Sequence, residues 1–212
     1  MTAERAAADP GATSPQAAER AANIESAVLA ATERLLARGG SFGALSTQRV
    51  AEEAGVARST LYLYFKEKNA LLVRLTADLK NGAHELMSSW SPEAPDALDL
   101  LTDTLLEVIR YYRQRAHILR AVQELAGSDS AAGRLWNELG PFEQLSQSWI
   151  EAAQAAGHAA AGIDAATASQ VIVHGGIRVI TQQALSGAPD RDAGVARELA
   201  ANQWFGAYRR TD

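Results

Sequence analysis

Hydroxyl, phenol and cationic side chains are concentrated in one short stretch, residues 58–68. It opens on Arg-Ser-Thr at 58–60, continues with Tyr62 and Tyr64, and ends at Lys68. An arginine can bind guanine O6 and N7 with two hydrogen bonds, and hydroxyls and cations bind phosphate oxygens. Side chains of these types on one exposed helix are suited to DNA binding.

Two short helices joined by a tight turn would hold these side chains outward. Gly55 tolerates the positive φ of such a turn, and Val56 can fill the gap between the helices. Apolar residues at 50, 51 and 54 form one stripe before the turn, and Leu61 with Phe65 form the matching stripe after it. The pattern predicts a helix-turn-helix.

This stretch resembles the N-terminal pattern of the TetR/AcrR family of transcriptional regulators. The family pattern is A-G-V-x-x-x-T-L-Y-x-x-F-x-x-K, followed by an acidic or polar residue and two leucines. The matching residues are Ala54, Gly55, Val56, Thr60, Leu61, Tyr62, Phe65, Lys68, Leu71 and Leu72.

The chain departs from the pattern at Ala57, where a serine commonly caps the second helix, and at Glu67, where serine or asparagine is common. A missing cap costs about 0.5–2 kcal/mol. We expect compensation by Ser59 or a frayed first turn.

The resemblance implies a homodimer that binds a palindromic operator in double-stranded DNA, most commonly as a repressor that a small molecule releases. It implies that base edges and phosphates are contacted by Arg58, Ser59 and Thr60 at the start of the second helix. It implies that the DNA backbone and thymine methyls are contacted by Tyr62 and Tyr64. It also implies that phosphates are bound by Lys68, Thr47 and Gln48, where neighbouring helices begin.

The charge of the chain is unevenly distributed. The net charge is -5, yet residues 20–80 carry nine lysines and arginines against six acids, whereas residues 81–212 carry ten against sixteen. A basic head attracts phosphates locally, and an acidic body limits non-specific DNA binding. The same excess could arise by chance, so the charge only supports the motif.

Composition excludes several classes of protein. With no cysteine, the 212-residue chain has no disulfide, thiolate metal site or cysteine nucleophile. We expect no signal peptide, no membrane span, no cofactor and a cytoplasmic location. The chain has no phosphate-binding glycine loop and no H-E-x-x-H, and its four histidines are far apart. We therefore do not expect an enzyme.

Helical periodicity throughout the chain predicts an all-α fold. We expect a flexible tail over residues 1–22, a three-helix DNA-binding domain over 23–67 whose first helix starts at Asn23, and a larger helical ligand-binding and dimerisation domain over 68–212. Pro141 should break the helix pattern around it.

Large aromatic rings with polar tips in the larger domain are candidates for lining a pocket for a largely apolar effector. Each of them could equally be a core residue. The candidates are Trp90, Tyr111, Trp136, Phe142, Trp149, His174 and Trp204. The Leu135-Trp136 pair and Trp204 also give this domain a looser similarity to a mycobacterial repressor of the family with a long aromatic pocket.

The family resemblance places the dimer contact on the last two helices. We expect one of these helices to contribute Ile172, Ile180 and Leu185 and the other to contribute Val195, Leu199 and Tyr208. His174 either orients a ligand or bonds a backbone carbonyl, and the glycines that follow it allow close helix approach.

The sequence favours a ligand-responsive repressor that binds DNA as a homodimer. The alternative is a ligand-binding or scaffold protein with little sequence-specific DNA binding.

Overall fold

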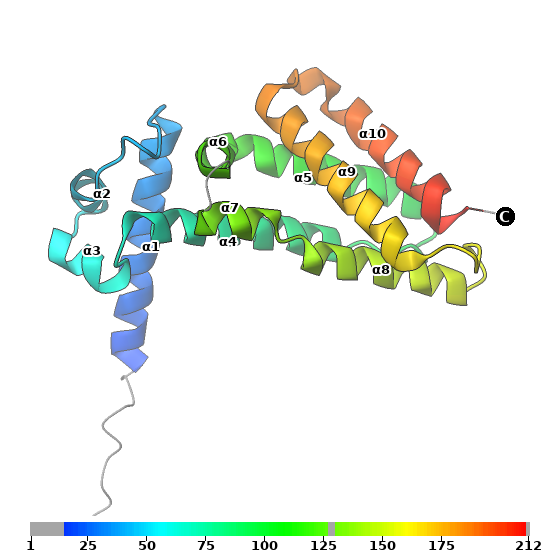
Figure 1. Ribbon diagram of the computed structural model, residues 1–212, viewed down its shortest axis with the longest axis horizontal. Helices are drawn as coiled ribbons and strands as arrows, with labels where there is room; N and C mark the ends of the chain where they lie inside the picture. Colours follow the sequence, from blue (N-terminus) through cyan, green and yellow to red (C-terminus); the bar gives the residue numbers. More distant parts are fainter. Residues whose placement is uncertain (1–14, 127–129, 211–212) are drawn as a thin grey trace, which may run out of the picture. The chain divides into compact units, whose positions relative to one another are not determined.

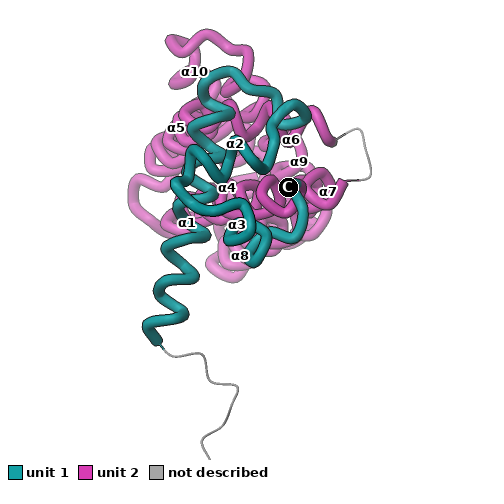
Figure 2. Tube along the Cα trace, turned by 90° about the vertical axis from the view of Figure 1, so that its left-hand side faces the viewer, with its two compact units in different colours: residues 1–68 teal, residues 69–212 magenta. Residues whose placement is uncertain are grey.

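The computed structural model describes residues 15–126 and 130–210, and every regular element within them is a helix or a single helical turn (Figure 1). The all-α prediction is confirmed. The chain divides into two compact units, residues 1–68 and 69–212, which Figure 2 shows in different colours. No helix among the described residues is long and apolar enough to cross a membrane.

Unit 1 contains three helices, α1 (Pro15–Ala37), α2 (Thr47–Ala54) and α3 (Arg58–Tyr64). The predicted start of the first helix at Asn23 is wrong, because α1 begins eight residues earlier. Proline is favoured in the first helical turn, and the alanine-, glutamate- and arginine-rich residues after Pro15 have high helix propensity without needing an apolar face. The rest of the expected tail, residues 1–14, lies outside the described part.

The turn between α2 and α3 has the geometry that the sequence predicts. Gly55 adopts a left-handed conformation with φ 68°, and the Val56 N–H donates to the Ala51 carbonyl at 3.0 Å. Val50 and Leu61 are fully buried, as is nearly all of Phe65. The apolar stripes therefore face inward, and the polar face of α3 remains outside.

Helix α1 is joined to α2 by one carboxylate. Glu53 accepts hydrogen bonds from Arg34 and Arg38, each at 2.8 Å. These bonds, first from Arg34 and then from Arg38, lower the pKa of Glu53. The ion pairs fix α2 on α1 and so orient the turn that carries α3.

Ala57 leaves the start of α3 without a side-chain cap. Replacing it with serine, Ala57→Ser, should raise the free energy of unfolding by about 0.5–2 kcal/mol, since the hydroxyl can accept from a free N–H in the first turn. Urea unfolding measures the change. Ala57→Val, which cannot cap, is the control, and an equal gain in both variants would contradict the capping argument.

The regular elements of unit 2 are α-helices, together with a 3₁₀ turn at Pro189–Arg191 and a π-helical turn at Trp204–Tyr208. Its helices are α4 (Lys68–Ser88), α5 (Ala97–Gln114), α6 (Ala116–Ala126), α7 (Ala131–Asn137), α8 (Gly140–Ala155), α9 (Ala165–Ser186) and α10 (Asp192–Gln203). Helix α5 packs against α9 and α10, and α8 packs along α9 (Figure 1). The chain breaks between α7 and α8, where Pro141 lies in the first turn of α8, so the predicted break is confirmed.

A half-buried arginine closes the end of α9. Arg113 on α5 donates to the carbonyls of Gln183 at 2.9 Å and Gly187 at 3.0 Å, and pairs with Asp192 at 2.5 Å. Helix ends leave carbonyls without intrahelical partners, and a cation there satisfies them. This cluster therefore joins α5, α9 and α10.

Lys80 makes a similar connection from α4 to the end of α7. Its ammonium donates to the carbonyls of Leu135 and Glu138. Burial lowers the pKa of Lys80, and the nearby charge of Glu138 opposes this shift. The contact holds α4 against the α7–α8 junction.

Candidate functional site

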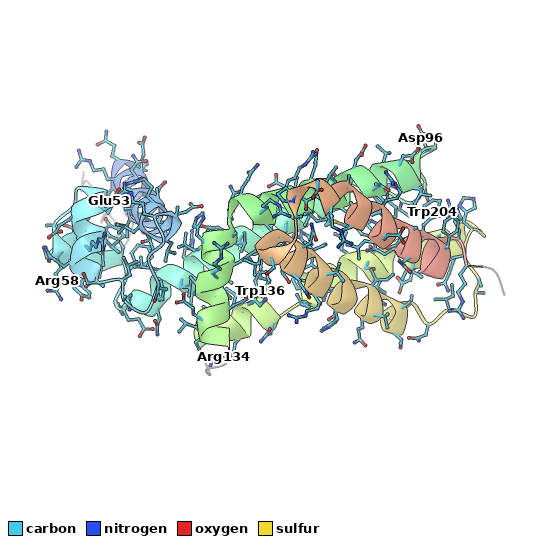
Figure 3. The ribbon with its side chains drawn as sticks, turned by 90° about the horizontal axis from the view of Figure 1, so that it is seen from above. Glu53, Arg58, Asp96, Arg134, Trp136 and Trp204 are labelled. Atoms are coloured by element: carbon cyan, nitrogen blue, oxygen red, sulfur yellow. The ribbon has the colours of Figure 1, made fainter. Side chains whose placement is uncertain are left out.

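The outer face of α3 is accessible. Arg58, Ser59 and Tyr62 are exposed, Thr60 and Tyr64 are half-buried, and Figure 3 shows Arg58 at the outer edge of the smaller unit. Sequence reasoning missed Leu63, which is 79% exposed. A helical wheel would have found it, since residue 63 lies about 200° from the buried Leu61 at 100° per residue.

A small hydrogen-bonded cluster organises this face. The Tyr62 hydroxyl lies 3.0 Å from the Thr47 hydroxyl and accepts from Arg58 at 3.3 Å. The Arg58 guanidinium also lies 5.5 Å from the centre of the Tyr62 ring. Hydrogen bonds with Thr47 and Arg58 lower the pKa of Tyr62. The cluster brings the start of α2 together with the start of α3.

The structure gives Gln48 and Lys68 partners within the chain. Gln48, at the start of α2, donates to Glu52 at 2.7 Å. The Lys68 ammonium donates to the carbonyls of Phe42 at 3.1 Å and Gly43 at 2.8 Å and lies 5.1 Å from the Phe42 ring. An ammonium has three donors, so Lys68 retains one for a phosphate while it anchors the 42–43 loop.

Unit 2 contains a narrow cavity of about 70 Å³ between α4, α5, α8, α9 and the π turn. Its wall combines many aliphatic side chains with four aromatic side chains from α5, α8 and the π turn. The lining residues are Ala83, Met87, Leu105, Val108, Tyr112, Leu139, Phe142, Leu145, Ser146, Trp149, Ile172, Val173, Gly176, Ile177, Ile180, Gln203 and Tyr208. None of them carries a charge, so the cavity suits an apolar molecule.

A second cavity, of about 390 Å³, is more polar. It is lined by Gln123, Trp136, Asn137, Leu139, His174, Ile177, Arg178 and Thr181. Leu139 and Ile177 line both cavities, so the two lie next to each other.

The seven aromatic and histidine candidates therefore separate into three groups. Phe142 and Trp149 line the apolar cavity, and Trp136 and His174 line the polar one. Trp90, Tyr111 and Trp204 line neither of these two cavities. Figure 3 shows Trp136 and Trp204 toward opposite ends of unit 2.

All three candidates outside both cavities have structural contacts. The Arg209 guanidinium lies 4.3 Å from the centre of the Trp204 ring. Trp90 is a core residue, since its ring packs against Trp149 at 4.8 Å and its indole N–H donates to the Ala97 carbonyl at 2.7 Å. Tyr111 donates to the Asp78 carbonyl at 3.3 Å. For Trp90 the core alternative was the correct one.

Sequence reasoning missed Tyr112 and Tyr208, both of which are almost completely buried in the cavity wall. For Tyr112 the signal was present. Leu101, Leu105 and Val108 recur on one face of α5, and that spacing continues to residue 112 rather than 111.

His174 pairs with a side chain rather than with a backbone carbonyl, since its Nε2 lies 2.8 Å from a Glu143 carboxylate oxygen and the side chain is largely exposed. The partner is a side chain of α8, which local sequence could not identify.

Two of the residues expected at the dimer contact lie inside the unit. Ile180 is 6% exposed and Tyr208 0% exposed, because α9 and the π turn direct them toward α5 and α8. The large apolar side chains that α9 and the π turn expose are Val171, Val179 and Phe205.

Comparison with known proteins gives a consistent result. Residues 28–75 match the family model of bacterial regulatory proteins, tetR family. No curated protein matches the chain.

Several solved regulators share its fold at low sequence identity. Salmonella enterica GusR is 17% identical, with a TM-score of 0.71 over 91% of this chain and 96% of its own. The TetR family transcriptional regulator PfmR from Thermus thermophilus is 18% identical, with a TM-score of 0.60 over 83% and 96%. FadR from Bacillus subtilis, solved in complex with stearoyl-CoA, is 18% identical, with a TM-score of 0.65 over 84% and 96%.

The solved regulators establish the fold of the whole chain, and the family model identifies the segment that contains α2, the turn and α3. On these two findings, residues 28–75 belong to the tetR family of bacterial regulatory proteins, and the chain has the fold of the solved structures.

Proposed function

We propose that this protein is a transcriptional repressor that binds a palindromic operator as a homodimer and releases it when a small, largely apolar molecule enters unit 2. The observation that carries the proposal is the outward face of α3, where Arg58, Ser59 and Tyr62 are exposed beside Thr47 of α2. Such a face can enter a major groove.

Helix α4 offers a route from ligand to DNA-binding unit. Ala83 and Met87 of α4 line the apolar cavity, and Lys68, its first residue, anchors the 42–43 loop of unit 1. A ligand that displaces α4 would therefore act on that loop through a continuous helix. A coupling free energy of about 1–3 kcal/mol is typical of such regulation.

The exposed apolar residues support a dimer contact on α9 and the π turn. Val171 and Phe205 are 69% and 63% exposed. Large apolar side chains exposed in this way are typical of an interface, and a two-fold dimer would present two α3 helices to successive major grooves roughly 34–36 Å apart.

Selection from random duplex DNA tests the proposal. The protein should enrich a palindrome, which has the same half-site on both strands. Gel-shift titration should then show an equal loss of affinity when either half-site is altered. Failure to enrich any sequence would favour the ligand-binding or scaffold alternative.

Arg58 and Lys68 should affect DNA binding differently. We expect Arg58→Ala to cost about 1–3 kcal/mol on the enriched operator and to blur the preference at one base pair, since arginine can read guanine directly. Lys68→Ala should weaken binding to all sequences about equally and reduce the salt dependence. Titration against single-base operator variants at several salt concentrations separates the two effects.

Because Lys68 also holds the 42–43 loop, the melting temperature of Lys68→Ala must be measured alongside its affinity. Lys66→Ala, an exposed lysine nearby, is the matched control for loss of one charge. Identical affinity profiles for Arg58→Ala and Lys68→Ala would contradict this division of roles.

A further inference from the structure

Two hydroxyl oxygens in the wall of the apolar cavity have no hydrogen-bond partner other than each other among the described residues. They are Ser146 Oγ on α8 and Tyr208 Oη in the π turn. Ser146 is 2% exposed and Tyr208 0% exposed. A buried donor without an acceptor is destabilising, so folded proteins rarely retain one without a reason.

The protons of the two hydroxyls show that the cavity lacks a hydrogen-bond acceptor. Burial raises the pKa of Tyr208 to about 12, and the Ser146 hydroxyl beside it opposes this rise. The phenol is therefore uncharged at neutral pH and can donate. The two hydroxyls carry two protons, so even if one hydroxyl turns to donate to the other, one proton remains without an acceptor.

The rest of the wall restricts the charge of any occupant. Gln203 contributes a buried side-chain amide to the cavity wall. Apart from this amide and the two hydroxyls, the side chains that line the cavity are apolar. A charged group there would lose its hydration without meeting an opposite charge. In contrast, the neighbouring polar cavity has Arg178 in its wall.

We propose that the apolar cavity takes an uncharged, largely hydrocarbon molecule with one hydrogen-bond acceptor, such as a ketone, ester or amide carbonyl oxygen, that binds the Ser146 and Tyr208 hydroxyls. This inference rests on the proposed function, in which the same cavity binds the effector. It adds the chemical class of the ligand and the two side chains that recognise it.

Three small probes of equal chain length test the class. The first, heptan-2-one, carries a carbonyl acceptor. The second, heptane, has no polar group, and the third, heptanoate, carries a negative charge. Trp149 in the cavity wall provides a fluorescence signal for binding, and thermal shift provides a second one. We expect the ketone to bind more tightly than the alkane, and the carboxylate to bind most weakly.

Tyr208→Phe removes the donor and keeps the ring. It should weaken ketone binding about tenfold, which corresponds to one hydrogen bond, and leave alkane binding unchanged. Ser146→Ala should have a smaller effect in the same direction. Ser148→Ala is the matched control, because that exposed serine on the same helix donates to the Leu145 carbonyl instead.

The ligand-free variants provide a second measurement. Since the Tyr208 hydroxyl has no partner other than Ser146 among the described residues, Tyr208→Phe should keep or raise the melting temperature of the free protein. Tyr111→Phe should lower it, because the Tyr111 hydroxyl donates to the Asp78 carbonyl. A marked loss of stability in Tyr208→Phe would show a structural role for the hydroxyl and would overturn the proposal.

The remaining outcomes distinguish the ligand class from the proposed function. The ligand class is overturned if Tyr208→Phe and the unsubstituted protein bind the ketone equally well. This result is expected if a water molecule accepts the hydrogen bond from the hydroxyl. Preferential binding of heptanoate, above all if Arg178→Gln abolishes it, also overturns the ligand class, as does no binding of the ketone at its highest soluble concentration. If the ketone binds as predicted but operator affinity does not change, the ligand class stands and regulation through this cavity is wrong.

Discussion

Replacing Arg113 with methionine, Arg113→Met, is expected to lower the free energy of unfolding by about 3–5 kcal/mol, the cost typical of breaking a buried ion pair from one side. Asp192 would lose its charge partner, and the carbonyls at the end of α9 would lose their donor. Chemical unfolding measures the loss. Arg197→Met, an exposed arginine on α10, is the control and should change stability little.

The cluster of Arg113 and Asp192 should make the free energy of unfolding depend on pH in the acid range. Burial opposes the ionisation of Asp192, but hydrogen bonds from Arg113 and Gln183 outweigh it, so its pKa lies below the ordinary value of 3.8. A lowered native pKa stabilises the fold above the unfolded pKa, and this stabilisation is lost as the pH falls through the native pKa. The difference in stability between the unsubstituted protein and Asp192→Asn should therefore narrow in strong acid. A difference that stays constant would contradict this role.

Replacing Phe205 with arginine, Phe205→Arg, is expected to convert the proposed dimer to a monomer and to weaken operator binding by roughly 100-fold or more, because each subunit would then bind a half-site alone. Phe205 is 63% exposed in the π turn, and an arginine pair across a two-fold axis would repel. Analytical ultracentrifugation and gel-shift titration measure the two effects.

Leu100→Arg is the matched control for this experiment. Leu100 is a 46% exposed apolar residue on α5. The variant should remain dimeric and bind the operator normally. If Phe205→Arg also remained dimeric, the contact would have to lie on another surface.

Local signals allowed much of the fold to be predicted. Gly55 supplied the positive φ of the turn, Pro141 marked the break before α8, and apolar spacing marked the helices of unit 2. The start of α1 could not be predicted in this way, because a solvent-exposed extension of a helix needs only helix propensity and carries no apolar stripe.

The cavity was harder to predict, since a residue type does not reveal which face of its helix is turned inward. Trp90 and Trp149 are the same residue type in ring contact, yet only Trp149 lines the apolar cavity. Tyr111 and Tyr112 differ by one position and by 100° of rotation, and only Tyr112 faces it. The pairing of His174 with Glu143 joins residues of two helices and depends on their tertiary packing.

The π-helical turn determines which side chains the end of the chain presents on each side. The Arg209 N–H reaches back five residues to Trp204, so the segment holds one residue more than an α-helix of the same span. If the segment kept all its residues but took the ordinary α-helical repeat, everything after it would be rotated by about 100°. The phenol of Tyr208 would then leave the cavity with its chemistry intact. At this point of the molecule, a change of helical repeat would alter ligand selectivity more deeply than an exchange of side chains.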